Sequence, residues 1–433
     1  MEIKRDLYLN RLINRMHNGF IKVITGIRRS GKSYLMNTIF YDYLISSGVN
    51  ENHIIMFAFD SAEDLMKIGE DPLKFDNDHA NEKVDPKKFL SYINDQIKDK
   101  NDYYLLLDEV QNLGAFETVL NGFLRKPNLD VYVTGSNSKF LSKDILTEFE
   151  GRGDEIHVLP LSFSEFAAFY NGTTEEAFDE YMIYGGLPAV ALMKTDEQKS
   201  NYLITQLTNI YLKDIINRYN LQSDRAISDL LDVVASGISS LTNPRKLSDV
   251  FASVKQEKIS PATVDKYIGH MEEAFILTRV KRYDVKGKRY IETPYKVYFE
   301  DVGLRNARLN FRQIEETHIM ENLIYNELRY RGYRVDVGAV ECRDKDKTGK
   351  EIRKWLEIDF IATSGSRKYY IQSAYTIPDN EKYKQETKSF DKVKDSFRKI
   401  IIVEKSMKSR RDENGYVTMG VKEFLLNENS LDE

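Results

Sequence analysis

The chain of 433 residues has few of the features that mark secreted or membrane proteins. It contains a single cysteine, Cys342, which excludes an intramolecular disulfide framework and fits a reducing compartment. No run of about 20 apolar residues is present to span a bilayer, and the first residues lack the apolar segment of a signal peptide. We therefore expect a soluble, cytoplasmic protein without a membrane partner.

The chain also lacks a large excess of charge of one sign. Its 63 Lys and Arg residues against 68 Asp and Glu residues give a net charge of −5 at pH 7, so any contact with nucleic acid has to come from a local basic patch. The six histidines are scattered, and no Cys/His cluster predicts a zinc site. With 41% hydrophobic residues, the length allows about two or three domains.

What the chain does have is a phosphate-binding loop close to its start. Residues 26–33 fit G-x-x-x-x-G-K-[ST] between an apolar run at 20–24 and a helix-like segment at 34–40. A strand, a glycine-rich loop and a helix in this order predict backbone N–H groups arranged around nucleotide phosphates. We expect Lys32 to reach the β and γ phosphates and Ser33 to bind Mg²⁺. The candidate nucleotide-binding residues are Gly26, Ile27, Arg28, Arg29, Ser30, Gly31, Lys32, Ser33 and Tyr34.

A second apolar run, at 103–107, ends in two adjacent carboxylates, Asp108 and Glu109. A Mg²⁺-dependent NTPase needs this arrangement, with Asp108 holding the metal through its water shell and Glu109 orienting the attacking water. An acid at the position of Glu109 favours hydrolysis of ATP over phosphoryl transfer to a small acceptor. The alternative is an exposed pair of acids in a loop.

Two polar positions further along the chain are candidates for contact with the γ-phosphate. The strand-like run at 130–134 leads into a turn where Ser136 or Asn137 would sense this phosphate, and an ordinary polar turn is the alternative. Arg152 is placed to act as an arginine finger on a neighbour's nucleotide or as a sensor within its own chain. A surface salt bridge explains Arg152 equally well, and Arg28 and Arg29 compete for the same role.

These motifs, in this order, resemble those of a family of prokaryotic AAA+-type ATPases. Members of this family join an archaeal-type ATPase module to a C-terminal half classed as a domain of unknown function. The resemblance implies an ASCE-type P-loop core, a homo-oligomer, and a winged-helix segment followed by a restriction-endonuclease-like domain. It rests on the segments 26–33, 105–111, 133–138, 159–166 and 184–188.

The residues after the ATPase core predict a winged helix on their own. Helical segments near 224–236, 246–253 and 261–273 precede a strand and a hairpin turn. Between residues 279 and 296, seven basic residues against two acids form an electrostatic footprint for a DNA backbone. A solvated hairpin or a protein-binding winged helix is the alternative. The candidate DNA contacts are Lys281, Arg282, Lys286, Lys288 and Arg289.

The end of the chain is expected to form a helix near 314–331, three strands, a helix at 381–395 and a last strand, which is the element order of a restriction-endonuclease-like core. Active nucleases of this fold hold a metal with an Asp and a further acid on the next strand, and a lysine two residues later activates water. This chain has Gln372-Ser373-Ala374 at those last positions, so a degenerate, binding-only domain is favoured. Gln372 could still offer its carbonyl oxygen to a metal, with Lys368 or Lys388 replacing the lysine. The remnants of the site are Glu321, Asp359 and Gln372.

We therefore expect an α/β chain in three parts: an AAA+-type ATPase with its lid at 1–200, a winged helix at 201–308 and a nuclease-like domain at 309–433. The predicted function is Mg²⁺-dependent hydrolysis of ATP to ADP and phosphate, coupled to DNA binding by the C-terminal half. One alternative is a signalling or defence NTPase that acts on protein partners. Another is an ATP-gated nuclease.

Overall fold

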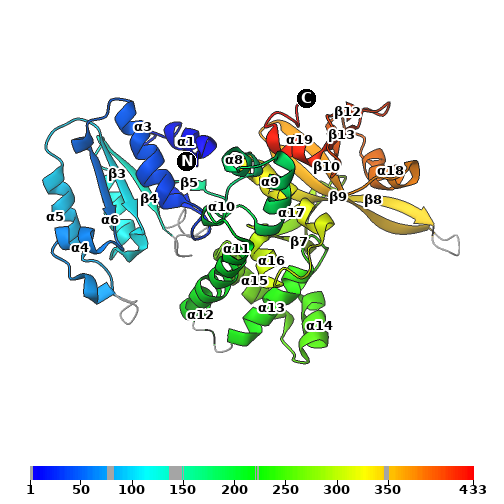
Figure 1. Cartoon of the computed structure of the whole chain (residues 1–433), viewed down its shortest axis with the longest axis horizontal. Coiled ribbons are helices and arrows are strands. Elements are labelled where there is room, and N and C mark those ends of the chain that lie inside the picture. Colours follow the sequence, from blue (N-terminus) through cyan, green and yellow to red (C-terminus); the bar gives the residue numbers. More distant parts are fainter. Residues whose placement is uncertain are drawn as a thin grey trace. The chain divides into compact units, whose positions relative to one another are not determined.

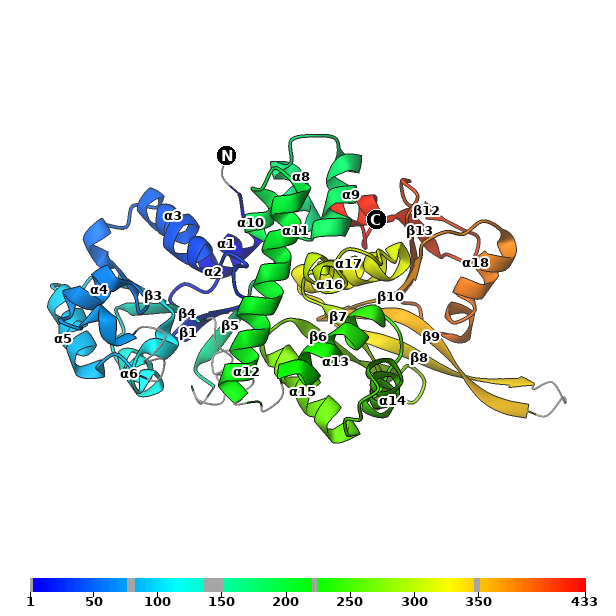
Figure 2. The ribbon, with the colours of Figure 1, turned by 60° about the horizontal axis from the view of Figure 1, so that its bottom comes forward.

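The chain folds into two compact units (Figures 1 and 2). The first comprises Met1–Leu159 with Glu273–Phe275, and the second comprises Pro160–Glu272 with Ile276–Glu433. The computed structural model describes residues 3–75, 82–135, 149, 151–219, 221, 224–345 and 351–433. No helix formed by these residues is long and apolar enough to cross a membrane.

The first unit is built on a parallel sheet with the strand order β2-β3-β4-β1-β5. All residues of β1, β3 and β4 are buried, because helices cover both faces of the sheet. These three strands are neighbours and run in the same direction, so the residues that follow them meet at one edge. The strands are β1 (Ile21–Thr25), β2 (Ile54–Ala58), β3 (Tyr103–Asp108), β4 (Leu129–Thr134) and β5 (Gly153–His157).

Apolar side chains attach the helices of this unit to the two faces of its sheet. On one face, Phe57 of β2 packs on Phe89 of α5, with ring centroids 5.1 Å apart. On the other, Phe40 packs on Tyr132 of β4 at 4.6 Å. The helical elements are α1 (Asp6–Ile13), α2 (Lys32–Tyr34), η1 (Leu35–Phe40), α3 (Tyr41–Ser46), η2 (Glu51–His53), α4 (Ala62–Lys67), η3 (Pro72–Phe75), α5 (Pro86–Gln96), η5 (Val110–Asn112) and α6 (Phe116–Phe123).

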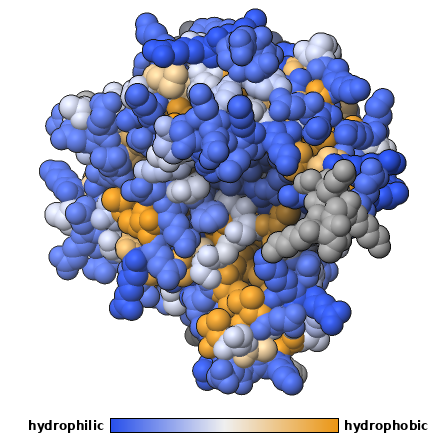
Figure 3. Space-filling view, turned by 90° about the vertical axis from the view of Figure 1, so that its right-hand side faces the viewer, coloured by the Kyte–Doolittle hydropathy of each residue, from blue (hydrophilic) through white to orange (hydrophobic). Residues whose placement is uncertain are grey.

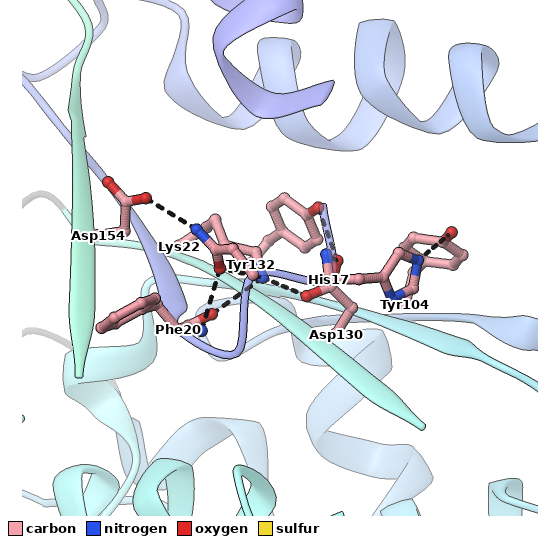
Figure 4. A network of polar contacts seen from close by, with 8 residues as sticks. His17, Phe20, Lys22, Tyr104, Asp130, Tyr132 and Asp154 are labelled. Atoms are coloured by element: carbon pink, nitrogen blue, oxygen red, sulfur yellow. Dashed lines mark hydrogen bonds and ion pairs between the residues drawn. The ribbon is translucent and has the colours of Figure 1, made fainter. Parts of the chain in front are cut away.

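A buried charge network lies near the amino ends of β1, β3 and β4 (Figure 4). Lys22, with none of its surface exposed, forms an ion pair with Asp130 and donates to the Phe20 carbonyl oxygen at 2.9 Å. Asp130 also accepts from the Tyr132 hydroxyl at 2.9 Å and from the backbone N–H of His17 at 3.1 Å. Burial lowers the pKa of Lys22, while Asp130 acts to raise it. The network ties the strands together at the edge opposite the glycine-rich loop.

The second unit begins with helices whose starts the sequence specifies well. Ser162 with Glu165, and Thr173 with Glu176, form capping boxes at the starts of α8 and α9. A continuous helical run then extends from α11 through η7 to α12, visible as the long green helix in Figure 2. The helical elements are α8 (Phe163–Phe169), α9 (Thr174–Tyr184), α10 (Pro188–Ala191), α11 (Asp196–Thr205), η7 (Gln206–Leu212), α12 (Lys213–Tyr219), α13 (Asp224–Ser236), α14 (Pro244–Lys255), α15 (Pro261–Glu273), α16 (Val302–Arg308), α17 (Glu316–Tyr330), α18 (Asn380–Thr387), η8 (Phe390–Lys392) and α19 (Val421–Leu426).

One sheet with the strand order β12-β13-β11-β10-β9-β8-β6-β7 runs through the second unit. The hairpin β6–β7 follows α13, α14 and α15, as the sequence predicts, but β6 also pairs in parallel with β8. The sheet thus joins strands from both sides of the boundary expected after residue 308, and the three-part division stays a prediction. The strands are β6 (Leu277–Asp284), β7 (Arg289–Phe299), β8 (Arg334–Lys345), β9 (Glu351–Ser364), β10 (Arg367–Ala374), β11 (Arg398–Val403), β12 (Arg410–Arg411) and β13 (Val417–Gly420).

The predicted order of helix, three strands, helix and strand is present as α17, β8, β9, β10, α18 and β11. The helix expected at 381–395 is shorter, because α18 ends at Thr387 and is followed by the turn η8. The pairs β12–β13 and β11–β13, and helix α19, extend the core beyond the predicted elements.

Candidate nucleotide-binding site

The loop between β1 and α2 has the backbone geometry that its glycines predict. Gly26 has φ +140°, and a Cβ atom at this residue would lie 2.2 Å from the Val158 carbonyl oxygen, so only glycine fits. Gly31 has φ +93° at the start of α2. The Ser30 hydroxyl is buried and has no hydrogen-bond partner among the described residues. A loop with no room for a side chain at Gly26 fits a bound nucleotide phosphate, and so does the unsatisfied hydroxyl of Ser30.

Arg5 supports the loop from outside the motif. Its guanidinium is 3% exposed and donates to the Ser30 carbonyl oxygen at 3.2 Å and to the Leu159 carbonyl oxygen at 2.7 Å. It therefore connects the loop to the residues that follow β5. The sequence gives no signal for this role, because Arg5 stands alone, 25 residues from Ser30.

The amine of Lys32 lies inside the loop. It donates to the carbonyl oxygens of Gly26 at 2.9 Å and Ile27 at 3.0 Å. Burial lowers the pKa of Lys32 to about 8, while Glu109 and Asp108 act to raise it and Arg28 lowers it further. An amine with this pKa is mostly protonated at pH 7, so Lys32 presents a positive charge to a phosphate.

Ser33 and Tyr34 follow Lys32 in the first turn of the helical run formed by α2, η1 and α3, and both side chains are exposed. The amino end of a helix favours anions. Arg28 is partly exposed, and Arg29 is exposed with φ +64°. Both arginines therefore stay candidates for a phosphate contact.

The two carboxylates at the end of β3 lie at the same sheet edge as the loop. Asp108 is 7% exposed, accepts from the Thr134 hydroxyl, and accepts from the amide of Asn37 at 3.3 Å. Glu109 has φ +51°, an unusual conformation for a residue with a side chain, and its N–H donates to the Thr134 hydroxyl oxygen at 3.3 Å. Thr134 thus holds both acids from the end of the neighbouring strand.

Sequence reasoning missed two further polar residues beside these carboxylates. Gln111 is 7% exposed, and its amide N–H donates to the Glu109 carboxylate. Asp60 follows β2, and its pKa is raised by burial and by the negative charges of Glu109 and Asp108. A glutamine two residues after the acid pair, and an acid just beyond an apolar strand, are signals that could have found them.

Of Ser136, Asn137 and Arg152, the candidates for contact with the γ-phosphate, the structure describes only Arg152. Ser136 and Asn137 lie outside the described residues. Arg152 precedes β5, and its carbonyl oxygen accepts from the Ile21 N–H at 2.9 Å, at the amino end of β1. Five residues of strand, roughly 16 Å, separate this position from the loop. This distance favours a role on a neighbour's nucleotide over that of a sensor within its own chain, and both roles stay predictions.

The basic segment at 279–296 is less exposed than its sequence predicts. Arg282 and Lys296 are 7% and 2% exposed, so they are not part of an outer basic surface. Lys281 forms an ion pair with Glu292 at 2.8 Å. The remaining candidates, Lys286, Lys288 and Arg289, are exposed near the turn of the hairpin.

Lys296 instead lies among three acids of the predicted nuclease-like site, and we call Lys296, Glu321, Glu357 and Asp359 the nuclease-like cluster. The sequence did not predict this position for Lys296. Its amine is 2.8 Å from carboxylate oxygens of Glu321 and Glu357 and 3.0 Å from Asp359. Burial alone would lower the pKa of Lys296, but Asp359 and Glu321 outweigh this effect and hold it well above its usual value. Burial raises the pKa of Glu321 to about 7, while Lys296 acts to lower it. A fixed lysine cation therefore faces the carboxylates.

Lys368, one of the two lysines considered as a replacement in this cluster, lies elsewhere. The amine of Lys368 lies over the rings of Tyr370 and Phe397, at 4.7 and 5.2 Å from their centroids. The side-chain amide oxygen of Gln372 is buried with no hydrogen-bond partner among the residues described. Within the described part of the chain, no group of three or more His, Cys, Asp or Glu residues could hold a metal ion.

Comparison with known proteins places the loop and its carboxylates in a recognised domain. A family model described as an AAA domain matches residues 18–167, and one described as a domain of unknown function, DUF8612, matches residues 175–315. An uncharacterized protein of Haemophilus influenzae is 32% identical over 410 residues, which cover 93% of this chain and 94% of that protein. An uncharacterized protein of Methanocaldococcus jannaschii is 26% identical over 409 residues, covering 90% and 81%.

Among solved structures, the ORC1 protein of Aeropyrum pernix, in complex with DNA, is 11% identical with a TM-score of 0.31, covering 71% of this chain and 92% of that one. The Cdc6p protein of Pyrobaculum aerophilum is 12% identical with a TM-score of 0.29, covering 74% and 97%. Both overall likenesses are weak. By its AAA domain and its identity to the Haemophilus influenzae protein along almost the whole length, the chain belongs to that protein's family, a family of AAA+ P-loop ATPases.

Proposed function

We propose that this protein hydrolyses ATP to ADP and phosphate. The observation that carries the proposal is the meeting of Lys32, Asp108 and Glu109 at one sheet edge, beside a loop in which Gly26 admits no side chain. Lys32 begins α2 directly after the loop, and Asp108 is the last residue of β3, which lies next but one to β1 in the sheet. A cation for phosphate, an acid for the metal and an acid for water are the groups that hydrolysis of a γ-phosphate requires.

In this proposal the protein positions the reactants and accepts one proton. Backbone N–H groups of the loop and the Lys32 amine bind the phosphates. Glu109 orients a water molecule and takes its proton as the water oxygen bonds to the γ-phosphorus. The bond between this phosphorus and the bridging oxygen of ADP breaks at the same centre, which releases phosphate.

Ser33 and Asp108 would hold Mg²⁺, which supplies charge neutralisation at the phosphates. A hydroxyl and a carboxylate are oxygen ligands of the kind that Mg²⁺ prefers. Thr134 and Asn37 fix the carboxylate by hydrogen bonds, so it is oriented before the metal arrives.

The test is ATP binding and turnover by the purified full chain and two variants. Lys32→Ala should abolish nucleotide binding, because the only amine inside the described loop is lost. Glu109→Gln should bind ATP and turn it over at least a hundredfold more slowly, because the amide cannot accept the proton of water. Lys98→Ala, an exposed lysine of the same unit, should behave as wild type. Normal turnover in Lys32→Ala or Glu109→Gln would refute the proposal.

We also propose that α13, α14, α15 and the hairpin β6–β7 act as a winged helix that binds DNA. Lys286, Lys288 and Arg289 support this role, since they are exposed together near the hairpin turn. Hydrolysis would then be coupled to DNA in a homo-oligomer, with Arg152 offered to a neighbour's nucleotide rather than to its own.

We propose further that the nuclease-like cluster does not cleave DNA. Lys296 occupies the space among Glu321, Glu357 and Asp359 that a divalent metal would need. A metal there would have to displace a buried ammonium ion from three carboxylates, at a cost of several kcal/mol. The cluster therefore acts as an internal ion-pair network that holds β7, β9 and α17 together.

A further inference from the structure

Trp355, the only tryptophan of the chain, is 38% exposed on a two-stranded ribbon. The ribbon consists of the outer parts of β8 and β9, which run out from the rest of their sheet in Figure 1. Figure 3 views the molecule from the side toward which this ribbon points, and most of the surface in that view is hydrophilic. A large ring left open to solvent in such a setting needs an explanation.

The strand register places basic side chains on the same face of the ribbon as this ring. Trp355 is directly opposite Glu341, and Arg353 is directly opposite Arg343. Residues two apart on a strand share a face, so all four side chains lie on one side. The side chains of Arg343 and Arg353 are 83% and 84% exposed, and each has an acid within 4 Å, at distances typical of weak surface ion pairs.

A second arginine, Arg282 of β6, lies against the ring itself. Its guanidinium carbon is 5.7 Å from the centroid of Trp355, within the range of a cation–π contact. Arg282 is only 7% exposed, and its Nε–H has no hydrogen-bond partner among the described residues. Burial lowers its pKa, while Glu357 and Asp284 act to raise it. The ring is therefore backed by a buried cation.

The hairpin beside the ring adds further positive charge. The amine of Lys286 donates to the carbonyl oxygen of Glu341 at 2.6 Å, directly across the ribbon from Trp355. Between residues 281 and 289 there are five basic residues and one acid. A ring with one open surface, next to cations that can neutralise phosphates, is the combination that recognises unpaired nucleotides.

We propose that Trp355, backed by Arg282, is a stacking platform for an unpaired base of single-stranded DNA. The inference rests on the proposed DNA binding and narrows the ligand to strands with free base faces. In a duplex both faces of each base are already stacked, so only a single-stranded or branched form can use the ring. Lys286 and the neighbouring cations bind the phosphates that flank the stacked base.

The test uses the fluorescence of Trp355, which reports on this site alone when the 27 tyrosines are not excited. The full chain without ATP is titrated with a dT12 strand, with tripolyphosphate, and with a DNA hairpin of the same length whose loop is a non-nucleotide linker, so that every base is paired. The strand should quench the emission, and the other two ligands should leave it nearly unchanged. Equal quenching by the hairpin or by tripolyphosphate, or no quenching by the strand, would overturn the proposal.

Variants separate stacking from charge and from folding. Trp355→Ala should weaken binding of a labelled dT12 strand about tenfold or more, whereas Trp355→Phe, which keeps a ring, should lose little. Phe397→Ala is the matched control, since Phe397 is 40% exposed and also has a lysine over its ring. Equal losses in Phe397→Ala and Trp355→Ala would reject the platform.

The outcome also distinguishes this inference from the proposed function. If hairpin DNA binds and Trp355→Ala binds dT12 like wild type, the platform fails and the DNA-binding role stands. If neither DNA binds at low salt, both fail. Lys32→Ala should still show quenching, because the platform does not use the nucleotide site.

Discussion

At the scale of single residues, the contact of Gln111 with Glu109, the carboxylate proposed to orient water, can be tested directly. Its amide N–H donates to Glu109, and both residues lie on the turn that follows β3. Gln111 is therefore a positioning residue that fixes one oxygen of the Glu109 carboxylate.

We expect Gln111→Met to lower the kcat for ATP about 10- to 100-fold with little change in KM. Methionine has nearly the same length but cannot donate, and a hydrogen bond to a charged group contributes about 1.5–3 kcal/mol. Gln111→Glu should move the acidic limb of the pH–rate profile to higher pH, because two adjacent carboxylates resist ionising together. A kcat equal to wild type in Gln111→Met would show that Glu109 is oriented by other contacts.

The motif residues could be predicted from the sequence because each lies within a few positions of its neighbours in the site. Gly26, Lys32 and Ser33 belong to one loop, and Asp108 and Glu109 end one apolar run. Arg5 and Lys296 could not be predicted, since their partners are 25 or more residues away and no local pattern marks them. Lys296 was counted in a basic patch because a charge count does not reveal burial.

At the scale of elements, the buried network of Lys22 links β1 to β4. Removing one partner of a buried ion pair lowers the stability strongly, because the remaining charge is still desolvated but has lost its partner. Lys22→Met should therefore lower the free energy of unfolding of the first unit by about 3–5 kcal/mol. Urea unfolding of the full chain, followed by circular dichroism, measures the change in the transition of this unit.

Two control variants test whether the loss of stability comes from the buried ion pair. Lys67→Met removes an exposed lysine paired with Asp64, and it should cost less than about 1 kcal/mol. Adding Asp130→Asn to Lys22→Met should recover part of the loss, because the neutral amide can still accept from Tyr132 and from the N–H of His17. A Lys22→Met protein as stable as wild type would mean that water reaches the pair.

Element prediction succeeded where one local pattern decides the structure. The apolar runs of β1, β3 and β4 follow from adjacent residues. The pairing of β6 with β8 joins residues about 55 apart, and no periodicity in either strand specifies it. The sequence therefore predicted the hairpin β6–β7 correctly and did not predict that the hairpin belongs to the same sheet as β9 and β10.

At the scale of the whole molecule, the open question is whether nucleotide turnover responds to DNA. Lys286, Lys288 and Arg289 are in the second unit, and the nucleotide site is in the first. If the proposed coupling holds, duplex, single-stranded or branched DNA should stimulate ATP hydrolysis by wild type, with one form most effective. The same Mg²⁺-containing reactions should show no cleaved DNA, because Lys296 fills the nuclease-like cluster.

Changing Lys286, Lys288 and Arg289 to Gln should abolish the stimulation while leaving the ATPase rate without DNA unchanged. Three lost phosphate contacts should reduce the slope of log Kd against log salt concentration by up to about 3. The matched control changes Lys405, Lys408 and Arg410 to Gln, three exposed basic residues of the same unit. Equally weakened DNA binding in both triple variants would mean that only the net charge matters. A rate that ignores every DNA form would instead favour a switch that acts on protein partners, with the hairpin as a solvated surface.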